Sequence, residues 1–393
     1  MNRNTIQLLV VCQLATFVIA GLVTTIGLIV PVAAEHFGVE VTTMAAQFTW
    51  FTGGGLVGQL VSFVIFDYFS IKRVLLVSHA VCAAALTAIH FTFQFEWLAL
   101  WLALFGVAIS AAICGSSTLI TQLWQGRARQ AAIVAQDAMF NGGGVIFAAV
   151  VTWFIAREYP FSSSYLVIVG VGVLVIALIL LSSFDHLKSA ADDPEQTTHT
   201  EWNASIVLIG VSLLVFMTAK ISLFIWAPQY ITTHFEVPAE TGAAFMSNVF
   251  TAALVGSVAG TWLVAHINVR FLVYGFVLLS LVSAYLLTTL QNLEEVLMLA
   301  FAYGLSVSAT FNAYVAFALT QVQVPTHRNI AYLLLMSSLG SSLAPLVSSQ
   351  IVEVSGQMVA ALTGAVIMLV FVTLSLGLAE LLSRRQSTVP AAT

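Results

Sequence analysis

The stretch NASIVLIGVSLLVFMTAKISLFIWAPQY, residues 203–230, decides the fold of this 393-residue chain. About 20 apolar residues of helix cross the hydrocarbon core of a bilayer, and this stretch is longer than that. Its one charged residue, Lys220, lies near the middle of the apolar run. A charge at that depth costs roughly 2.5–3.5 kcal/mol, so it normally faces protein or a water-filled cavity. The stretch predicts a transmembrane helix with a lysine in a substrate site. The alternative is a structural lysine, neutralised by a carboxylate or by helix C-terminal carbonyls.

Apolar runs of this kind recur along the whole chain. The composition is 60% hydrophobic and 7% charged, whereas about 25% of the residues of an ordinary soluble domain are charged. Backbone groups in lipid must be satisfied within their own segment, so the spans are expected to be helices. We predict an all-α integral membrane protein with twelve spans, at about residues 6–33, 43–66, 74–92, 97–123, 131–155, 162–184, 203–231, 239–265, 270–290, 295–323, 329–351 and 358–382.

One long polar stretch, from about residue 183 to 201, divides the spans six and six. We therefore expect an N-terminal six-helix bundle at 1–184, a linker at 185–202 and a C-terminal six-helix bundle at 203–393. The two halves also repeat weakly. Residues 119–123, LITQL, recur 199 positions later as ALTQV, and a shift of 198 carries HFGV at 36–39 onto HFEV. The same shift of 199 carries Arg129 onto Arg328 and Asp67 onto His266. Parallel repeats of six spans are typical of one large class of transporters, whose substrate site lies near the membrane midplane.

The basic residues give the orientation of the spans. In bacterial membrane proteins lysine and arginine concentrate in the cytoplasmic loops. Apart from Lys220, the loops on one side hold all basic residues but Arg157. We expect that side, which includes both termini and the linker, to be cytoplasmic, in a bacterial inner membrane. The basic residues on it are Arg3, Lys72, Arg73, Arg127, Arg129, Lys188, Arg270, Arg328, Arg384 and Arg385.

The six-plus-six organisation and one loop motif resemble the major facilitator superfamily. The link after the second span reads FDYFSIKR, residues 66–73. Its Asp67 and Arg73 fit the acidic-and-basic loop motif of that superfamily, while Ser70 replaces the expected glycine. The resemblance implies a twelve-helix fold that works by alternating access. It also implies a latch of the inward-closed state, which we assign to Asp67 and Arg73, together with Arg127.

Within the superfamily, the chain is similar to the TsgA-like transporters, relatives of the fucose-permease group. Four stretches carry this resemblance, at residues 119–127, 136–140, 224–230 and 351–356. The fucose-permease group has carboxylates in its first and fourth spans, and this chain has none in either. The proton-coupled sugar mechanism of that group therefore does not transfer residue by residue.

Two charges lie clearly inside the predicted spans, Lys220 and Asp137. Helical spacing places Asp137 on one face of its span with Asn141. We interpret Asp137 as a proton carrier. The alternatives are a permanent pair with Lys220 or a hydrogen bond to Arg127 or Arg129, because structural ion pairs also bury carboxylates. A direct bond between Asp137 and Lys220 is left open.

Polar side chains at helical spacing on spans one, seven and ten supply further candidates for the site. In the superfamily, these spans and span four line the central cavity. Asparagine and glutamine in lipid need partners, so they either pair with other helices or meet substrate. Trp226 has the alternative of an interfacial anchor. The predicted substrate contacts are Lys220, Asn312, Gln13, Tyr314, Asn141 and Trp226.

The leading hypothesis is a secondary active transporter for a small polar solute, anionic or sugar-like, coupled to protons. A lysine suits a carboxylate or phosphate. The alternative is a proton-driven exporter of apolar or drug-like compounds, which the 27 phenylalanines allow. An intramembrane enzyme is disfavoured because no histidine is positioned beside Gly115-Ser116, and a sensor that binds without translocating stays possible. We expect a monomer in lipid, with a small-molecule substrate and a coupling ion as partners. We expect no cofactor, no metal site, because no acidic or histidine cluster has ligand spacing, and no nucleic-acid partner.

Overall fold

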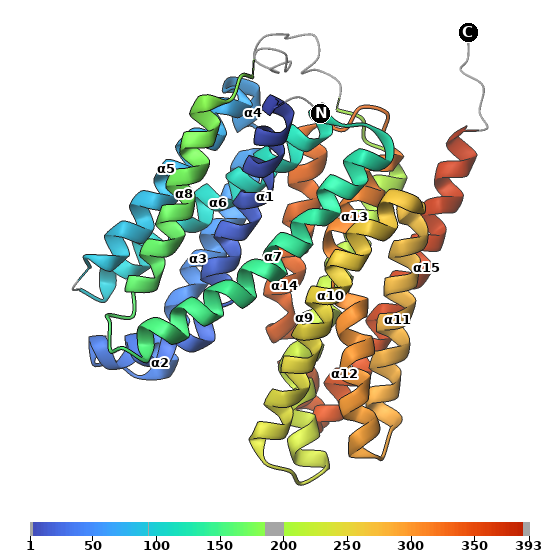
Figure 1. Ribbon diagram of the computed structural model, residues 1–393. Coiled ribbons are helices and arrows are strands. Elements are labelled where there is room, and N and C mark those ends of the chain that lie inside the picture. The colour runs from blue at the N-terminus through green and yellow to red at the C-terminus, as the bar shows by residue number, and fades with distance from the viewer. Residues whose placement is uncertain (1–2, 93, 185–199, 388–393) are drawn as a thin grey trace. The chain divides into compact units, whose positions relative to one another are not determined.

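The computed structural model describes residues 3–92, 94–184 and 200–387, which form helices joined by short connections, with no strand among them (Figure 1). Most of the predicted linker, residues 185–199, lies outside the described residues. The helices are α1 (Arg3–Val23), α2 (Ile26–Phe37), α3 (Val41–Ser62), α4 (Ile65–Tyr68), α5 (Ile71–His90), α6 (Glu96–Leu123), α7 (Gly126–Ile155), α8 (Ser163–Leu181), α9 (Ala204–His234), α10 (Ala239–His266), α11 (Val269–Thr289), α12 (Leu293–Val307), α13 (Thr310–Ala318), the 3-10 turn η1 (Leu319–Gln321), α14 (His327–Ser355) and α15 (Met358–Ser387).

The predicted spans correspond to these helices. Eleven described segments are long and apolar enough to cross a membrane, one of them running through α12, α13 and η1. The remaining predicted span, at 43–66, is α3, which has 22 residues but is rich in threonine, glutamine and glycine. The first predicted span is broken into α1 and α2 at Thr24-Thr25. There the hydroxyls of Thr24 and Thr25 donate to the carbonyls of Ala20 and Gly21, at 2.7 and 2.6 Å, in competition with the helical pattern.

The helices form two compact units. Unit 1 takes the described parts of residues 1–125, 139–200 and 326–335, and unit 2 takes those of 126–138, 201–325 and 336–393. Two helices contribute to both units, because the start of α7 belongs to unit 2 and the start of α14 to unit 1. The division predicted from the sequence places all of α7 in the N-terminal half and all of α14 in the C-terminal half. That division stays a proposal.

The same pairs of spans pack together in both units. In unit 1 the closest helix pairs are α3 with α6, α5 with α6, α5 with α8 and α1 with α8. In unit 2 they are α10 with α12, α11 with α12, α11 with α15 and α9 with α15. Numbered by span, each pair of the second set is a pair of the first set moved on by six spans. The two six-helix pseudo-repeats expected from the sequence are thus present in the packing.

Glycines at repeated positions allow close helix approaches. A Cβ added to Gly106 in α6 would lie 2.2 Å from the Phe51 carbonyl oxygen in α3. A Cβ added to Gly304 in α12 would lie 2.3 Å from the Val249 carbonyl oxygen in α10. Both members of the second pair follow the first by 198 positions. Small residues let transmembrane helices approach backbone to backbone, and this chain uses the same two contact points in each repeat.

Candidate functional site at the break in span ten

Span ten is interrupted between α12 and α13. Ala309 leaves the helical conformation, at φ −115° and ψ 15°. Three hydroxyls surround this point and donate to carbonyls of the preceding turn: Ser306 to Tyr303 at 2.6 Å, Ser308 to Leu305 at 2.7 Å, and Thr310 to Ser306. Serine and threonine that bond back to the previous turn weaken and bend a helix. The break therefore leaves carbonyl groups free at the end of α12 and N–H groups free at the start of α13.

Lys220 lies at the first of these two helix ends. It is midway along α9, and its Nζ donates to the Val307 carbonyl oxygen at 3.5 Å, at the long end of the hydrogen-bond range. The ammonium also lies 5.6 Å from the centre of the Phe224 ring. The Tyr303 hydroxyl donates to the Lys220 carbonyl oxygen at 3.4 Å, which ties α9 to α12 beside the break. A cation at the C-terminal end of α12 is favoured by the helix dipole.

Asp137 lies at the other helix end. It is 8% exposed and lies about three turns into α7, which begins at Gly126, earlier than the predicted start of that span. The backbone N–H of Asn312, in the first turn of α13, donates to Asp137 Oδ2 at 3.1 Å. The Asn312 side chain lies beside the same carboxylate. A carboxylate at a helix N-terminus satisfies a free N–H and is favoured by the dipole.

Asp137 and Lys220 do not form a direct ion pair. Among the described residues the ion pairs within 4 Å involve other groups, although the two charges are close enough to interact electrostatically. Instead, each charge compensates one end of the interrupted helix. All of these contacts lie within unit 2. Two charges of opposite sign, the buried Asp137 and the partly buried Lys220, thus lie on either side of the break. Asn312, a third predicted site residue, links Asp137 to α13.

The repeat explains why span ten breaks and span four does not. Positions 198 residues earlier than Ser306 and Thr310 hold Ala108 and Ala112, and α6 is continuous there. Alanine has no hydroxyl that can compete for backbone carbonyls. The repeat shift also changes within the span, from 198 at Gly304 to 199 at residues 318–322, so span ten contains one extra residue. An extra residue cannot be added to a helix without disturbing its hydrogen bonds, and here it coincides with the break.

The glycines of α10 make room for the break. A Cβ added to Gly256 would lie 2.6 Å from Ser308 Oγ and 2.8 Å from Ser308 Cβ, and one added to Gly260 would lie 3.0 Å from Ala309 Cβ. We expect Gly256→Val to lower the thermal denaturation midpoint of the purified protein, because overpacking costs about 1–3 kcal/mol. Gly275→Ala in α11 is the control, since a Cβ there meets nothing within 4 Å. Equal midpoints for the two variants would contradict the close packing of α10 on the break.

The other predicted substrate contacts are spread over both units. Tyr314 in α13 is fully buried, and its hydroxyl lies 3.3 Å from the Ser212 hydroxyl. Trp226 lies in α9 about two turns beyond Lys220, and its indole N–H is buried without a hydrogen-bond partner in the described part of the chain. Gln13 in α1 and Asn141 in α7 belong to unit 1 and are partly buried. Their role as substrate contacts stays a prediction for all four.

Asp67, predicted to belong to a latch, lies in an ion-pair cluster of unit 1. Arg328 Nη2 donates to Asp67 Oδ2 at 2.6 Å, and His327 Nε2 lies 3.3 Å from Asp67 Oδ1. Both partners belong to the first turn of α14. Arg73 is exposed and takes part in no ion pair of the described residues. The cluster therefore ties the start of α14 to the loop after span two, while the role of Arg73 stays a prediction.

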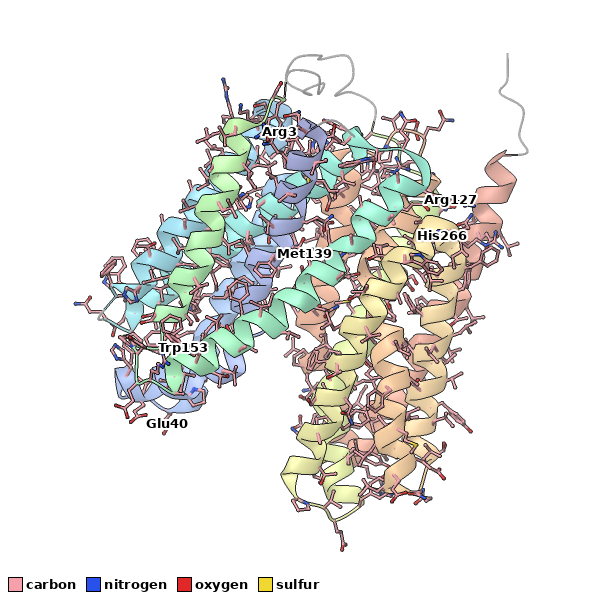
Figure 2. The ribbon with its side chains drawn as sticks, viewed as in Figure 1. Arg3, Glu40, Arg127, Met139, Trp153 and His266 are labelled. Carbon is pink, nitrogen blue, oxygen red and sulfur yellow. The ribbon has the colours of Figure 1, made fainter. Side chains whose placement is uncertain are left out.

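The third predicted latch residue, Arg127, makes the corresponding contact in unit 2. Figure 2 shows Arg127 at the start of α7 beside His266 at the end of α10, and Arg127 Nη1 donates to the His266 carbonyl oxygen at 3.0 Å. The repeat carries Asp67 onto His266. The end of span two binds an arginine from the start of span eleven, and the end of span eight binds an arginine from the start of span five.

Sequence reasoning missed three features of these sites. It did not identify the break itself, although Ser306, Ser308 and Thr310 form a run of hydroxyl residues inside an apolar span. It did not identify Gly256, although Gly256 and Gly260 are four residues apart in α10, a spacing of small residues that is typical of close helix packing in membranes. It also missed Arg328 as the partner of Asp67, although the repeat had already singled out both. No group of three or more metal-ligating side chains occurs in the described ranges.

Comparisons with known proteins agree with this architecture. The family model described as Major Facilitator Superfamily matches residues 13–329. "Protein TsgA homolog" of Buchnera aphidicola subsp. Acyrthosiphon pisum is 21% identical over 355 residues, covering 90% of this chain and 91% of the relative. "Protein TsgA homolog" of Serratia proteamaculans is 20% identical over 359 residues, covering 90% of each chain.

Solved structures share the fold at low sequence identity. A crystal structure of the transporter FucP in the outward conformation superposes with a TM-score of 0.76 at 11% identity, covering 96% of this chain and 99% of that chain. The human organic anion transporter MFSD10 gives a TM-score of 0.74 at 11% identity, covering 95% and 99%. With the family model matching most of its length, this chain belongs to the Major Facilitator Superfamily of secondary transporters for small solutes, and within it resembles the TsgA-like and fucose-permease-like members.

Proposed function

We propose that this protein is a proton-coupled secondary transporter of a small polar solute that carries an anionic group. The observation that supports this most is the pair of charges at the break in span ten, the partly buried Lys220 and the buried Asp137. A secondary transporter needs a group that attracts the solute and a group that carries the coupling ion. Intramembrane ionisable residues usually have such roles, because their burial is otherwise costly.

Lys220 is the proposed substrate anchor. An ammonium can donate three hydrogen bonds, and the one that Lys220 donates within the described part of the chain is long, to Val307. Donor capacity therefore remains for an anionic group of the solute. The residues that we propose as further contacts are Asn312, Trp226, Tyr314, Gln13 and Asn141. The FucP relative is named a fucose–proton symporter and MFSD10 an organic anion transporter, so both sugar-like and anionic solutes occur among proteins of this fold.

Asp137 is the proposed proton carrier. It is the carboxylate that we assigned to the interior of a span, and its charge acts on Lys220. Protonation removes its negative charge, so loading and release of a proton change the electrostatic balance at the break. Both termini are proposed to be cytoplasmic in a bacterial inner membrane, from the one-sided distribution of basic residues, and the protein is proposed to act as a monomer.

Transport in proteoliposomes of the purified protein tests the proposal. The solutes are radiolabelled sugar acids, dicarboxylates and monosaccharides, measured by counterflow and by uptake with an imposed proton gradient. We expect counterflow of at least one anionic solute, and accumulation of that solute when the side of addition is acidic. Counterflow of neutral sugars alone would reject the anionic substrate, and accumulation that ignores the proton gradient would reject proton coupling.

The aromatic side chains beside Lys220 favour a second candidate, a proton-driven exporter of drug-like compounds. The Phe224 ring lies 5.6 Å from the Phe250 ring and 6.0 Å from the Tyr303 ring, centre to centre, which gives the site an apolar wall. Lipophilic cations added to the same assay distinguish the two candidates. Proton-driven efflux of these cations, with no anion counterflow, would favour export.

We further propose that Asp67 and Arg127 act in a latch that stabilises one conformation of the transport cycle. Asp67→Asn is expected to weaken the charged hydrogen bond to Arg328, worth about 1.5–3 kcal/mol, and so to lower the denaturation midpoint and alter the transport rate. Arg73→Gln tests the other predicted latch residue of the same loop, and we expect a smaller effect from it because Arg73 is exposed and without an ion pair among the described residues. An equal effect of both substitutions would indicate a general loss of loop charge instead of a specific latch.

A further inference from the structure

The first turn of α13 is capped by a residue of another helix. Ala309, at its N-cap position, has no side chain that can accept a hydrogen bond, and none of the side chains of α13 caps it. The acceptor is instead the Asp137 carboxylate, which comes from α7 and takes the N–H of Asn312. A local cap is a permanent part of its helix. A cap supplied by a titratable group on a second helix is removed when that group loses its charge or moves.

We propose that Asp137 is a detachable cap of α13, and that the break in span ten transmits proton binding to the transport movement. This inference rests on the proposed function and specifies its coupling element. In the charged state, the carboxylate holds the start of α13. A proton taken from the water phase converts it into a neutral acid, which accepts the Asn312 N–H more weakly and no longer compensates the helix dipole. The start of α13 is then free to shift relative to α12, and deprotonation on the other side restores the contact.

Few charged or titratable groups near the break can influence the protonation of Asp137. The charged group that acts on it is Lys220 from α9. Near the break, α12 and α13 bring the tyrosines Tyr303 and Tyr314, whose hydroxyls are engaged with the Lys220 carbonyl and with Ser212. On α7 itself, Arg129 lies about two turns before Asp137. Lys220 binds the end of α12 through Val307, and Asp137 binds the start of α13 through Asn312. Protonation of Asp137 alone would therefore leave the end of α12 compensated by a charge and the start of α13 uncompensated.

The hydroxyls at the break act as positioning groups in this scheme. Thr310 donates to Ser306, and Ser280 of α11 donates to the Ser306 hydroxyl at 2.8 Å, which fixes the end of α12 to α11. The corresponding positions of the uninterrupted α6 hold alanine. Thr310 and Ser306 therefore keep α12 and α13 apart as two elements, so that the start of α13 responds to Asp137.

Hydrogen–deuterium exchange of the full-length protein in nanodiscs tests the proposal directly, at one pH for all variants. Asp137→Asn imitates the protonated side chain. We expect amides 310–313 to exchange about 2- to 30-fold faster in Asp137→Asn, the range that follows from losing the interaction of a carboxylate charge with the dipole at a helix N-terminus. Amides in the first half of α12 are expected to stay unchanged. Unchanged exchange at 310–313, or faster exchange along the whole of span ten, would overturn the proposal.

A pair of threonine variants separates positioning from general stability. Thr310→Ala removes a hydroxyl bond at the break, while Thr261→Ala removes a bond from Thr261 Oγ1 to the Ser257 carbonyl, 2.9 Å long, in the uninterrupted α10. We expect Thr310→Ala to reduce proton-driven accumulation about 2- to 10-fold while solute counterflow is retained. Thr261→Ala should leave both unchanged. Equal losses in both variants, or a loss of counterflow together with accumulation in Thr310→Ala, would contradict a positioning role.

The exchange experiment also separates this inference from the proposed function. Faster amide exchange at 310–313 in Asp137→Asn, together with wild-type transport that ignores the proton gradient, would retain the detachable cap and reject proton coupling. Unchanged exchange, with accumulation lost in Asp137→Asn, would retain the proton carrier and reject the cap.

Discussion

Lys220→Met is expected to weaken binding of the anionic solute in counterflow strongly while the protein stays folded. Methionine keeps the length of the side chain but removes the charge. Truncating one partner of a buried charged contact costs about 2–5 kcal/mol, which corresponds to a loss of roughly 30-fold or more in substrate affinity. The loss is measured as the solute concentration that gives half-maximal counterflow in proteoliposomes. A thermal-shift titration with the same solute, in which wild type is stabilised and the variant is not, gives an independent readout.

The controls for Lys220→Met distinguish an anchor from a structural cation. Lys220→Arg keeps the charge but not the shape, so it should retain part of the anion response. If Lys220 only neutralises the α12 end, Lys220→Met would lower the denaturation midpoint and leave solute affinity unchanged. Equal stabilisation of wild type and variant by neutral sugars would reject Lys220 as the substrate anchor.

Asp137→Asn is expected to eliminate accumulation of the solute against its gradient and to preserve solute counterflow. Asparagine has nearly the same shape as aspartate. Its neutral amide oxygen accepts the Asn312 N–H more weakly than the carboxylate does, and it cannot take up a proton at any working pH. Without a site for the coupling ion, an imposed proton gradient can no longer drive the solute. We expect the accumulation ratio to fall to about one, while counterflow proceeds because it requires no net proton movement. Accumulation is measured with an acidic outside buffer and a neutral interior.

A second carboxylate provides the control for Asp137→Asn. Glu380 in α15 bonds Arg270 and the Tyr274 hydroxyl in unit 2, away from the contacts that define the break. Glu380→Gln should therefore change stability without removing coupling. Full pH-driven accumulation in Asp137→Asn would exclude Asp137 as the proton carrier and leave it a purely structural cap.

Much of the fold could be predicted because lipid imposes simple rules on sequence. The length of each apolar run set the helices, since a bilayer of fixed thickness requires about 20 residues per span. The repeat of residues 119–123 at 318–322 indicated the two halves, and the helix packing in units 1 and 2 repeats in the same way. Helix ends were less predictable. α7 begins at Gly126, several residues before its apolar run, because polar residues at the edge of a membrane can continue a helix.

The candidate site was predictable in its charges but not in its geometry. Lys220, Asp137 and Asn312 could be selected from the sequence because buried charges and amides are costly in lipid and so are rarely accidental. The sequence could not establish how these residues meet. A direct Asp137–Lys220 bond was left open by the sequence, and in the structure each charge is bound to a different end of an interrupted helix.

The sequence by itself determined that this chain crosses the membrane as helices, that it repeats, and which charges lie inside the spans. These properties depend on composition and on local periodicity, which each segment carries alone. Only the tertiary structure decided that span ten breaks at Ala309 and that Asp137 reaches Asn312 while Lys220 reaches Val307. The break depends on hydroxyls competing for carbonyls, on one extra residue, and on room left by Gly256 of another helix. Such a balance among α7, α9, α10 and α12–α13 exists only once these helices have packed.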